Sequence, residues 1–431
     1  MGWGEGGRRV GALRGAGRTG SLSGMRFVKQ LSCVVCGKCA SAPKSAGTCP
    51  ACNDAFAILD IEYDMPRVAM SMTRASLENR PLNHWRYHEL LPIEPDEEAF
   101  AWPVGWTPIM YTPRLAEWAG CRALRIKDDG KNPTSSFKDR ASSVGVLHAR
   151  QAKATRIACA STGNAASSLA GYAAMAGMPA TIFVPQRAPE PKVAQLLIYG
   201  ADVRRVRGTY AQAYDLCTAE CDKNGWYNRN CAINPYLVEG KKTCGLEIAE
   251  QTAGHEPDWV VISVGDGCTI AGVAKGLLQM KELGIIGKLP RVLGVQAAGM
   301  DPVARAFETG ELPKDFSGQT LADSIDVPVP RNWRKAIKFT KLTNGAMVRV
   351  SDEEITEAMK SAGRLAGVFA EPAAAAGIAG VRRAVMDGVI AKTADVLAVV
   401  TGNGLKDIKT AMSIAGSPTE VDPLPDRAAS A

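Results

Sequence analysis

Two groups of residues in this sequence have side chains and a spacing that suit chemistry. Lys138 follows residues 132–137, a turn with Pro133 and three hydroxyl side chains that is predicted to be exposed and to cap a helix. A lysine in the first turn of a helix opposes the helix dipole, which disfavours its charged form and favours a nucleophilic amine. A solvated lysine in a charged triplet is the alternative. The second group is five cysteines between Cys33 and Cys52, whose thiolates suit a metal ion.

The cysteine spacing predicts a zinc ribbon over residues 25–62. Two C-x2-C pairs with twelve residues between them provide the four predicted ligands, namely Cys33, Cys36, Cys49 and Cys52. Four thiolates complete the tetrahedron that a structural zinc ion requires. Cys39 is a spare thiol that could replace a ligand, and five unrelated thiols are the alternative. A redox pair is disfavoured because no βαβ pattern precedes the motif.

Three further loops follow predicted strands. Residues 161–164, Ser-Thr-Gly-Asn, combine hydroxyls with the N–H groups of a helix N-terminus, which together suit an anion. Residues 265–269, Gly-Asp-Gly-Cys-Thr, include two glycines that allow the backbone to approach a phosphate closely. Residues 401–404, Thr-Gly-Asn-Gly, follow the last apolar strand. Ligands of open α/β sheets bind beyond the carboxyl ends of the strands, so these loops are candidate binding sites.

Alternating strands and helices are predicted to position these loops. Apolar strands are expected at residues 157–160, 180–184, 203–206, 259–263, 292–296 and 395–400. Helices are expected at residues 164–176, 191–199, 270–283, 352–365 and 372–386. Continuous apolar strands that alternate with helices indicate parallel sheets. The sequence therefore predicts two parallel-sheet α/β domains with a cleft between them.

Composition excludes several classes of protein. The 431-residue chain has a net charge of +7, and this excess lies in residues 1–48, which hold eight basic side chains and one acidic one. The balanced remainder disfavours nucleic-acid binding. No uncharged apolar run approaches the roughly 18 residues of a membrane span. Twelve cysteines without a secretory signal indicate a reducing compartment, so we expect a cytoplasmic protein.

We assign no function to two further features of the sequence. Residues 1–24 are predicted to be a disordered tail or to precede a true start at Met25, and a transit peptide is disfavoured because the segment has no amphipathic pattern. His84 and His88 are four residues apart, but Trp85 stands where a zinc protease motif requires glutamate. We therefore expect both histidines to be surface or packing residues.

Together the loops resemble the fold-type-II pyridoxal-phosphate enzymes, and among them the threonine synthases. The resemblance spans roughly residues 100–412. It rests on the order of the motifs N-P-T-S-S-F-K-D-R, S-T-G-N, N-P-Y…E-G-K-K-T, G-D-G-C-T, G-V-Q-A-A, F-A-E-P-A and T-G-N-G-L-K-D. The domain division expected from it is a large domain of residues 63–139 and 240–415, a small α/β domain of residues 140–239 and a C-terminal tail of residues 416–431. Some relatives also carry an N-terminal cysteine ribbon.

The resemblance implies a role for each loop. Lys138 would hold pyridoxal 5′-phosphate as an internal aldimine and act as general base once the substrate displaces it. Phe137 would pack against the cofactor ring, Asn164 would bond the phenolic oxygen, and Thr401 would face the pyridine nitrogen. The remaining matches are Gly265, Asp266, Gly267, Cys268 and Thr269 for the cofactor phosphate, and Ser161 and Thr162 for the substrate carboxylate.

The implied reaction converts O-phospho-L-homoserine and water to L-threonine and phosphate in a homodimer. We expect the ribbon to be a structural cap on the enzyme body, and a partner-binding module is the alternative. Two departures from the family pattern bear on this reading. Asp266 places a carboxylate in a loop that usually reads G-N-x-G-N, so its side chain is expected to point away from the phosphate. Leu237 and Val238 occupy a stretch where many relatives place a basic side chain, which leaves Lys192 and Arg187 as candidate ligands of the substrate phosphate.

Two alternatives stay open at this point. One is a pyridoxal-phosphate-dependent dehydratase or β-replacement enzyme of the same fold that acts on threonine, serine or a similar substrate, which both departures favour. The other is a non-enzymatic, ribbon-based binding protein with a degenerate enzyme body. The intact Lys138, Asn164 and Thr401 argue against the second alternative.

Overall fold

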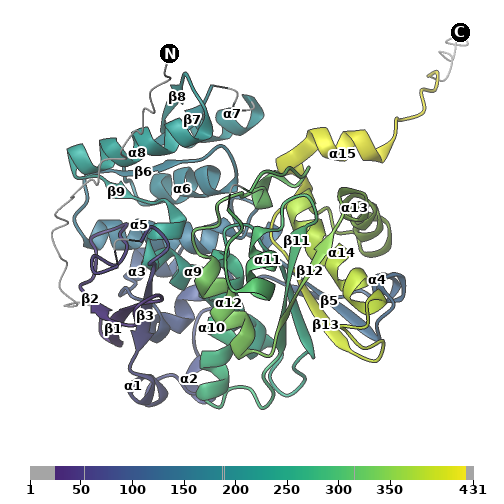
Figure 1. Cartoon of the computed structure of the whole chain (residues 1–431), viewed down its shortest axis with the longest axis horizontal. Coiled ribbons are helices and arrows are strands. Elements are labelled where there is room, and N and C mark those ends of the chain that lie inside the picture. The colour runs from purple at the N-terminus through teal and green to yellow at the C-terminus, as the bar shows by residue number, and fades with distance from the viewer. Residues whose placement is uncertain (1–24, 53, 187, 189, 315, 424–431) are drawn as a thin grey trace, which may run out of the picture. The chain divides into compact units, whose positions relative to one another are not determined.

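The chain forms two compact units in the computed structural model (Figure 1). Unit 1 comprises Met1–Leu77, Tyr87–Ala101 and Ala141–Gly240, and unit 2 comprises Glu78–Arg86, Trp102–Arg140 and Lys241–Ala431. The structure describes residues 25–52, 54–186, 188, 190–314 and 316–423. The tail predicted over residues 1–24 and the last eight residues of the predicted C-terminal tail lie outside this range.

The cysteine-rich segment of unit 1 forms a small antiparallel sheet of order β2-β1-β3. Its strands are β1 (Val28–Cys33), β2 (Cys39–Ala40) and β3 (Leu59–Tyr63). Short helices follow along the chain: α1 (Met65–Ala69), α2 (Arg74–Glu78), the 3-10 helix η1 (His84–Leu90) and α3 (Glu97–Phe100). The two turns that carry the cysteine pairs lie next to this sheet.

The rest of unit 1 is built on a parallel sheet of order β8-β7-β6-β9. Its strands are β6 (Ile157–Ala160), β7 (Ala180–Pro185), β8 (Asp202–Val206) and β9 (Tyr227–Asn228). The helices are α6 (Asn164–Met175), α7 (Glu190–Ile198) and α8 (Tyr210–Asn224), and the 3-10 helix η3 (Cys231–Ile233) leads into α9 (Pro235–Gln251). Cys217 and Cys221 of α8 pack on Ala158, Ala160 and Phe183 of the sheet. These cysteines are therefore core residues.

Unit 2 is built on a six-stranded sheet of order β12-β11-β10-β13-β5-β4. All neighbouring strands are parallel except the edge pair of β4 (Ile109–Tyr111) and β5 (Ala123–Asp128). The other strands are β10 (Trp259–Ser263), β11 (Arg291–Ala297), β12 (Ala346–Val350) and β13 (Asp395–Val400). β10 is buried along its whole length and β13 along all but its first residue, as their continuous apolar sequences require.

Helices cover both faces of this sheet (Figure 1). One layer contains α4 (Pro113–Ala119), α13 (Asp352–Ala366) and α14 (Pro372–Met386), and the other contains α10 (Cys268–Glu282), α11 (Pro302–Thr309) and α12 (Trp333–Leu342). The alanine-rich α14 packs closely on the strands because its side chains are small. The 3-10 helices η2 (Asp129–Lys131), η4 (Asp323–Ile325) and η5 (Gly404–Asp407) lie in connecting loops.

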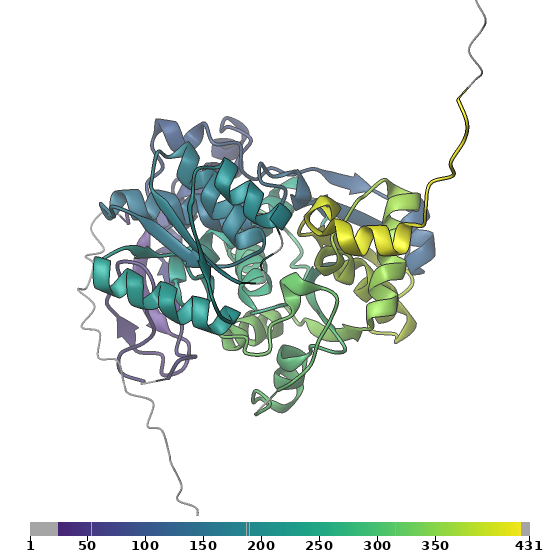
Figure 2. The same ribbon diagram turned by 90° about the horizontal axis from the view of Figure 1, so that it is seen from above.

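The C-terminal part ends in α15 (Ile408–Ala415), and residues 416–423 lead away from this helix without regular structure (Figure 2). Across the described part of the chain, we find no helix with the length and apolar character that crossing a membrane requires.

The predicted fold class, two parallel-sheet α/β parts after an N-terminal cysteine module, is confirmed. The sequence did not reveal β5, because Arg125, Lys127 and Asp128 interrupt its apolar pattern. These side chains are buried nevertheless: Arg125 pairs with Asp395 and Lys127 with Glu247, while the Asp128 carboxylate lies 3.9 Å from the amine of the largely exposed Lys131. Internal ion pairs therefore hid a central strand from pattern analysis.

Candidate active site and cysteine cluster

Lys138 is the first residue of α5 (Lys138–Gln151), as predicted. The preceding turn is closed by the Ser135 N–H, which donates to the Asn132 carbonyl over 2.7 Å. The Asp139 carboxylate accepts the Thr134 N–H over 2.7 Å and also the Thr134 hydroxyl. The prediction of an exposed turn is wrong, because Thr134, Ser136 and Phe137 are all buried. The hydroxyl side chains are used within the protein, so the position of Lys138 is fixed by its neighbours.

The lysine loop is held against the loop that follows β13. The Phe137 N–H donates to the Thr401 carbonyl over 2.8 Å, and the Asn403 N–H donates to the Ser135 carbonyl over 3.1 Å. β13 pairs in parallel with both β5 and β10, so the loops that follow these three strands lie at one edge of the sheet. Unit 2 thus brings together the predicted lysine loop, the 401–404 loop and the glycine loop at the edge where α/β proteins bind ligands.

The glycine loop connects β10 to α10. Gly267 is the N-cap residue of α10 and has a φ of +91°, which favours glycine. A Cβ atom at Gly267 would lie 2.9 Å from the Ala336 Cβ and 3.0 Å from the Asn332 carbonyl oxygen, so no other residue fits without a shift. Cys268 and Thr269 form the first turn of the helix rather than part of the loop.

Asp266 uses its carboxylate inside the glycine loop. Its Oδ1 accepts the Cys268 N–H over 2.9 Å, which satisfies an amide at the start of α10. Burial would raise the pKa of Asp266, but the charge of Lys241 opposes this effect. The Cys268 N–H and the charge of Lys138 lower this pKa further, so the carboxyl stays below its usual pKa and is ionised at neutral pH.

The hydroxyl loop of unit 1 connects β6 to α6, as predicted. Gly163 is the N-cap residue of α6, and its N–H donates to the Ser161 Oγ over 3.2 Å. The Ser161 N–H donates to the Phe183 carbonyl over 3.1 Å, which ties the loop to β7. Ser161 and Thr162 are half-buried, while Asn164 is buried in the first turn of α6.

The other predicted phosphate ligands are less defined. Lys192 lies on α7 and is half-buried, and Arg187 lies outside the described residues. Leu237 is fully buried on α9, where a Cβ atom at Gly145 would lie 2.5 Å from its Cδ2. This position is thus part of the core of unit 1. Sequence reasoning missed Lys241, which is buried on the same helix and acts on Asp266 in unit 2.

A buried ionic cluster stands directly behind the lysine loop in unit 2, and the sequence analysis did not find it. The Arg140 guanidinium lies 2.6 Å from the Asp129 Oδ2 and 2.6 Å from the Glu247 Oε1, and all three side chains are fully buried. Lys127 Nζ lies 3.0 Å from the Glu247 Oε2. Burial would raise the pKa of Glu247, but pairing with Arg140 and Lys127 lowers it to about 2. Because the partners are far apart in sequence, no local spacing could have revealed the cluster.

We expect Arg140→Leu to lower the free energy of unfolding by about 3–5 kcal/mol, because Asp129 and Glu247 lose their shared partner inside the protein. Arg150→Leu on the same helix is the matched control. Arg150 also pairs with two carboxylates, Asp96 and Glu98, but these pairs are largely exposed and should contribute less than about 1 kcal/mol. Urea unfolding measures both variants, and equal losses would contradict a special role for the buried cluster.

Two histidines are buried in a neutral state. His84 places its Nδ1 3.3 Å from the Thr243 Oγ1, and burial together with the charge of Arg140 lowers its pKa to about 3. His148 places its Nδ1 3.0 Å from the Tyr227 hydroxyl, and burial lowers its pKa to about 3. His84 is therefore a packing residue, in agreement with the sequence, and neither ring is suited to carry a proton near neutral pH.

Because these two histidines are buried in the neutral state, we expect the folded chain to lose stability in mild acid. An unfolded histidine binds a proton below about pH 6.5, whereas His84 and His148 stay neutral in the folded chain down to about pH 3. The unfolded state thus binds more protons in this window, and the free energy of unfolding falls as the pH is lowered. Each histidine contributes a slope of about 1.4 kcal/mol per pH unit. Unfolding between pH 7.5 and 5 should show a smaller slope in His84→Gln and in His148→Gln than in the unmodified protein.

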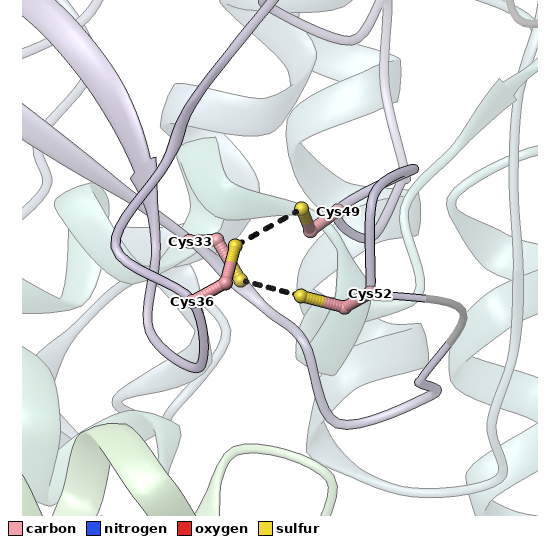
Figure 3. A group of neighbouring side chains, drawn as sticks. All are labelled: Cys33, Cys36, Cys49 and Cys52. Carbon is pink, nitrogen blue, oxygen red and sulfur yellow. Dashed lines mark hydrogen bonds between the residues drawn. The ribbon is translucent and has the colours of Figure 1, made fainter.

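Four cysteines of the ribbon gather at one point (Figure 3). The four Sγ atoms of Cys33, Cys36, Cys49 and Cys52 lie within 4.8 Å of one another. The Cys33–Cys52 and Cys36–Cys49 separations are 3.7 and 3.8 Å. Zinc–sulfur bonds of about 2.3 Å in a tetrahedron place the sulfurs about 3.8 Å apart, so the cluster fits a zinc ion. Cys39 lies outside the cluster, and its Sγ donates to the Gln30 Oε1.

The thiols of the cluster differ in pKa: burial raises the pKa of Cys49, and hydrogen bonding with Cys36 together with burial raises the pKa of Cys52 to about 12. A hydrogen bond from the Lys38 backbone and others from neighbouring thiols lower the pKa of Cys36 to about 7. The Val35 N–H donates to the Cys33 Sγ over 3.3 Å. Backbone donors that stabilise a thiolate favour the form of cysteine that binds metals.

Comparisons with known proteins identify the family. Residues 102–402 match the family model of pyridoxal-phosphate dependent enzymes. The chain belongs to this family. Within it, the chain is 38% identical to a threonine synthase of Methanosarcina acetivorans over 395 residues, which covers 91% of this chain and 96% of that protein. It is 33% identical to a threonine synthase of Methanocaldococcus jannaschii, over 90% of this chain and 96% of that protein.

A solved structure shares the fold. Threonine deaminase isoform 2 from Solanum lycopersicum aligns with a TM-score of 0.61 at 24% identity, covering 69% of this chain and 79% of that chain. This likeness supports the pyridoxal-phosphate enzyme fold and carries no information on the substrate.

Unit 2 fits the cofactor of this family. An amine at the start of α5 and a glycine loop at the start of the 15-residue α10 lie at one sheet edge. The free N–H groups and the dipole of a helix N-terminus suit a phosphate, and a lysine amine condenses with an aldehyde. Pyridoxal 5′-phosphate carries both groups.

Proposed function

We propose that this pyridoxal-phosphate dependent enzyme converts O-phospho-L-homoserine and water to L-threonine and phosphate. Two relatives named threonine synthase, which align over at least 90% of the chain, support this reaction. The observation that carries it is the position of Lys138, held beside Thr401 at the sheet edge that also presents the glycine loop. Membership in an enzyme family argues against the alternative of a ribbon-based binding protein.

We assign the cofactor-binding residues of unit 2 as follows. Lys138 bonds the cofactor aldehyde, Phe137 packs against its ring, and the Thr401 hydroxyl faces its pyridine nitrogen. A hydroxyl is a weak partner for that nitrogen, so the ring stays largely uncharged there. Gly265, Asp266, Gly267, Cys268 and Thr269 surround the phosphate; the Cys268 N–H is bonded to the Asp266 carboxylate, so the other backbone N–H groups of this segment are the donors.

In unit 1 we assign Asn164 to the phenolic oxygen of the cofactor, and Ser161 and Thr162 to the carboxylate of the substrate. The buried position of Asn164 and the half-buried hydroxyls are consistent with these roles. Lys192 and Arg187 are proposed to bind the substrate phosphate.

The proposed reaction depends on proton transfers by Lys138. When bound, the cofactor withdraws electrons from the substrate and acidifies its Cα–H. Lys138 would take the α-proton and then a proton from Cβ of the substrate as phosphate leaves Cγ. Protons would return to Cγ and to Cα as a water adds its hydroxyl to Cβ, which gives L-threonine. The ion cluster around Arg140 fixes the start of α5 and so the base of the Lys138 side chain.

One observation favours a second candidate. The buried Leu237 leaves no basic side chain at the position where many relatives bind the substrate phosphate. A dehydratase or β-replacement enzyme that acts on threonine or serine does not need such a ligand.

A product assay separates the two candidates. The purified enzyme is incubated with O-phospho-L-homoserine or with L-threonine, and phosphate, threonine and 2-oxobutyrate are measured. We expect threonine and phosphate in equal amounts from the first substrate. Formation of 2-oxobutyrate from threonine, without turnover of O-phospho-L-homoserine, would instead identify a dehydratase.

We further propose that the ribbon binds one structural Zn²⁺ through Cys33, Cys36, Cys49 and Cys52, and that the enzyme acts as a cytoplasmic homodimer in threonine biosynthesis. The sulfur separations support the metal. None of the twelve cysteines forms a disulfide, which suits a reducing compartment. Size-exclusion chromatography with light scattering tests the dimer.

A further inference from the structure

Asn332 has a buried side chain whose hydrogen bonding is incomplete. It precedes α12 and is 1% exposed. Both its amide nitrogen and its amide oxygen are buried, and neither has a partner among the described residues. A buried amide without partners is rare, because it loses its bonds to water without replacement. The side chain is therefore expected to bind a group that the chain does not provide.

The backbone of Asn332 is joined to the glycine loop. Its N–H donates to the Asp266 carbonyl over 3.1 Å. Its own carbonyl oxygen lies so close to Gly267 that a Cβ atom there would be 3.0 Å away. Other buried polar atoms also lack partners, but Asn332 is fixed by its backbone to the loop assigned to the cofactor phosphate.

One backbone N–H donor of the glycine loop already bonds a side chain of the same loop. Asp266 Oδ1 accepts the Cys268 N–H, so that amide is already occupied. Asp266 also adds a negative charge beside a group that is itself anionic. A phosphate bound here needs donors from outside the loop, and a neutral amide supplies a donor without adding charge.

We propose that Asn332 is a further ligand of the cofactor phosphate, with Nδ2 donating to a phosphate oxygen. Its Oδ1 accepts from a water that the same phosphate holds. This assignment rests on the proposed binding of pyridoxal 5′-phosphate at the glycine loop. Asn332 is distant in sequence from the glycine loop. Its Nδ2 would replace the Cys268 N–H donor that Asp266 occupies.

The test compares two ligands that differ only in the phosphate. Full-length protein stripped of cofactor is titrated with pyridoxal 5′-phosphate and with pyridoxal, and binding is followed by visible absorbance. We expect Asn332→Ala to weaken binding of pyridoxal 5′-phosphate about 10- to 100-fold, the range for a hydrogen bond to a charged group. Binding of pyridoxal should be unchanged. Asn332→Asp keeps the shape but brings a negative charge, and it should weaken phosphate-dependent binding at least as much.

Control measurements distinguish a failure of this proposal from a failure of the proposed phosphate site. Asn224→Ala, which alters an exposed asparagine on α8, should leave both affinities unchanged. Equal weakening for both ligands would show a merely structural role and overturn the proposal, as would unchanged binding of pyridoxal 5′-phosphate. The proposal would also be overturned if Asn332→Ala weakened only the inhibition of the cofactor-loaded enzyme by inorganic phosphate. Asn332 would then be assigned to the substrate phosphate. If the unmodified protein does not prefer pyridoxal 5′-phosphate to pyridoxal, the proposed phosphate site itself fails.

Discussion

Lys138→Ala is expected to lower kcat/KM for O-phospho-L-homoserine by about 10²- to 10⁴-fold, the range of a general base in catalysis. The variant loses the amine that bonds the cofactor and the amine that moves the protons of the substrate. The visible absorbance of the protein-bound cofactor should change at the same time. The fold should persist, because Lys138 is half-buried and the hydrogen bonds of its loop come from its neighbours.

Lys131→Ala is the matched control for this prediction. Lys131 precedes the same loop, but its side chain is 60% exposed and its ion pair with Asp128 is long, at 3.9 Å. It should keep full activity and the absorbance of the bound cofactor. A Lys138→Ala enzyme that retains more than about one tenth of the activity would contradict the role of Lys138 as base.

The sequence predicted those parts of the site that are local in the chain. Lys138, the hydroxyl loop and the glycine loop each lie at a strand or helix end, where a few neighbouring residues define both structure and chemistry. The strands β10 and β13 were predicted with their observed bounds because burial on both faces requires a continuous apolar sequence.

The parts that escaped prediction depend on partners far apart in the chain. Arg140 is stabilised by Asp129 and by Glu247, which is more than 100 residues away. Asn332 reaches the glycine loop only through the tertiary packing of α12. In both cases a polar residue is buried against its usual preference, and its partner is defined by the fold rather than by sequence spacing.

The ribbon and the adjoining Tyr63, the last residue of β3, are joined to the rest of unit 1 by specific hydrogen bonds. The Gly47 N–H donates to the Ile233 carbonyl over 2.8 Å, and the Tyr63 hydroxyl donates to the Glu239 Oε2 over 2.9 Å. The Tyr236 hydroxyl donates to the Pro43 carbonyl over 2.5 Å. All three partners outside the ribbon belong to residues 233–239, the segment that begins α9. The ribbon therefore supports a motif that carries the family resemblance, which favours the role of a structural cap.

Cys49→Ser is expected to remove the zinc and to unfold the ribbon. The buried Cys49 is one of the four clustered thiols, and four-thiolate sites of this kind bind zinc with about 10–16 kcal/mol, most of which is folding free energy. The bound metal should fall from one zinc per chain to none, as measured by mass spectrometry of the intact protein under native conditions. Cys39→Ser is the control, because Cys39 lies outside the cluster and should leave the zinc in place.

The effect of zinc loss should extend beyond the ribbon, but only as far as its hydrogen bonds reach. In Cys49→Ser, the amides of residues 233–239 should exchange with solvent faster, because Pro43, Gly47 and Tyr63 no longer hold them. The buried sheet of unit 2 should keep its protection, since its core is formed by its own helices. Faster exchange throughout both units would show that the ribbon is required for the whole fold. Unchanged exchange at residues 233–239 would mean that the metal stabilises the ribbon alone.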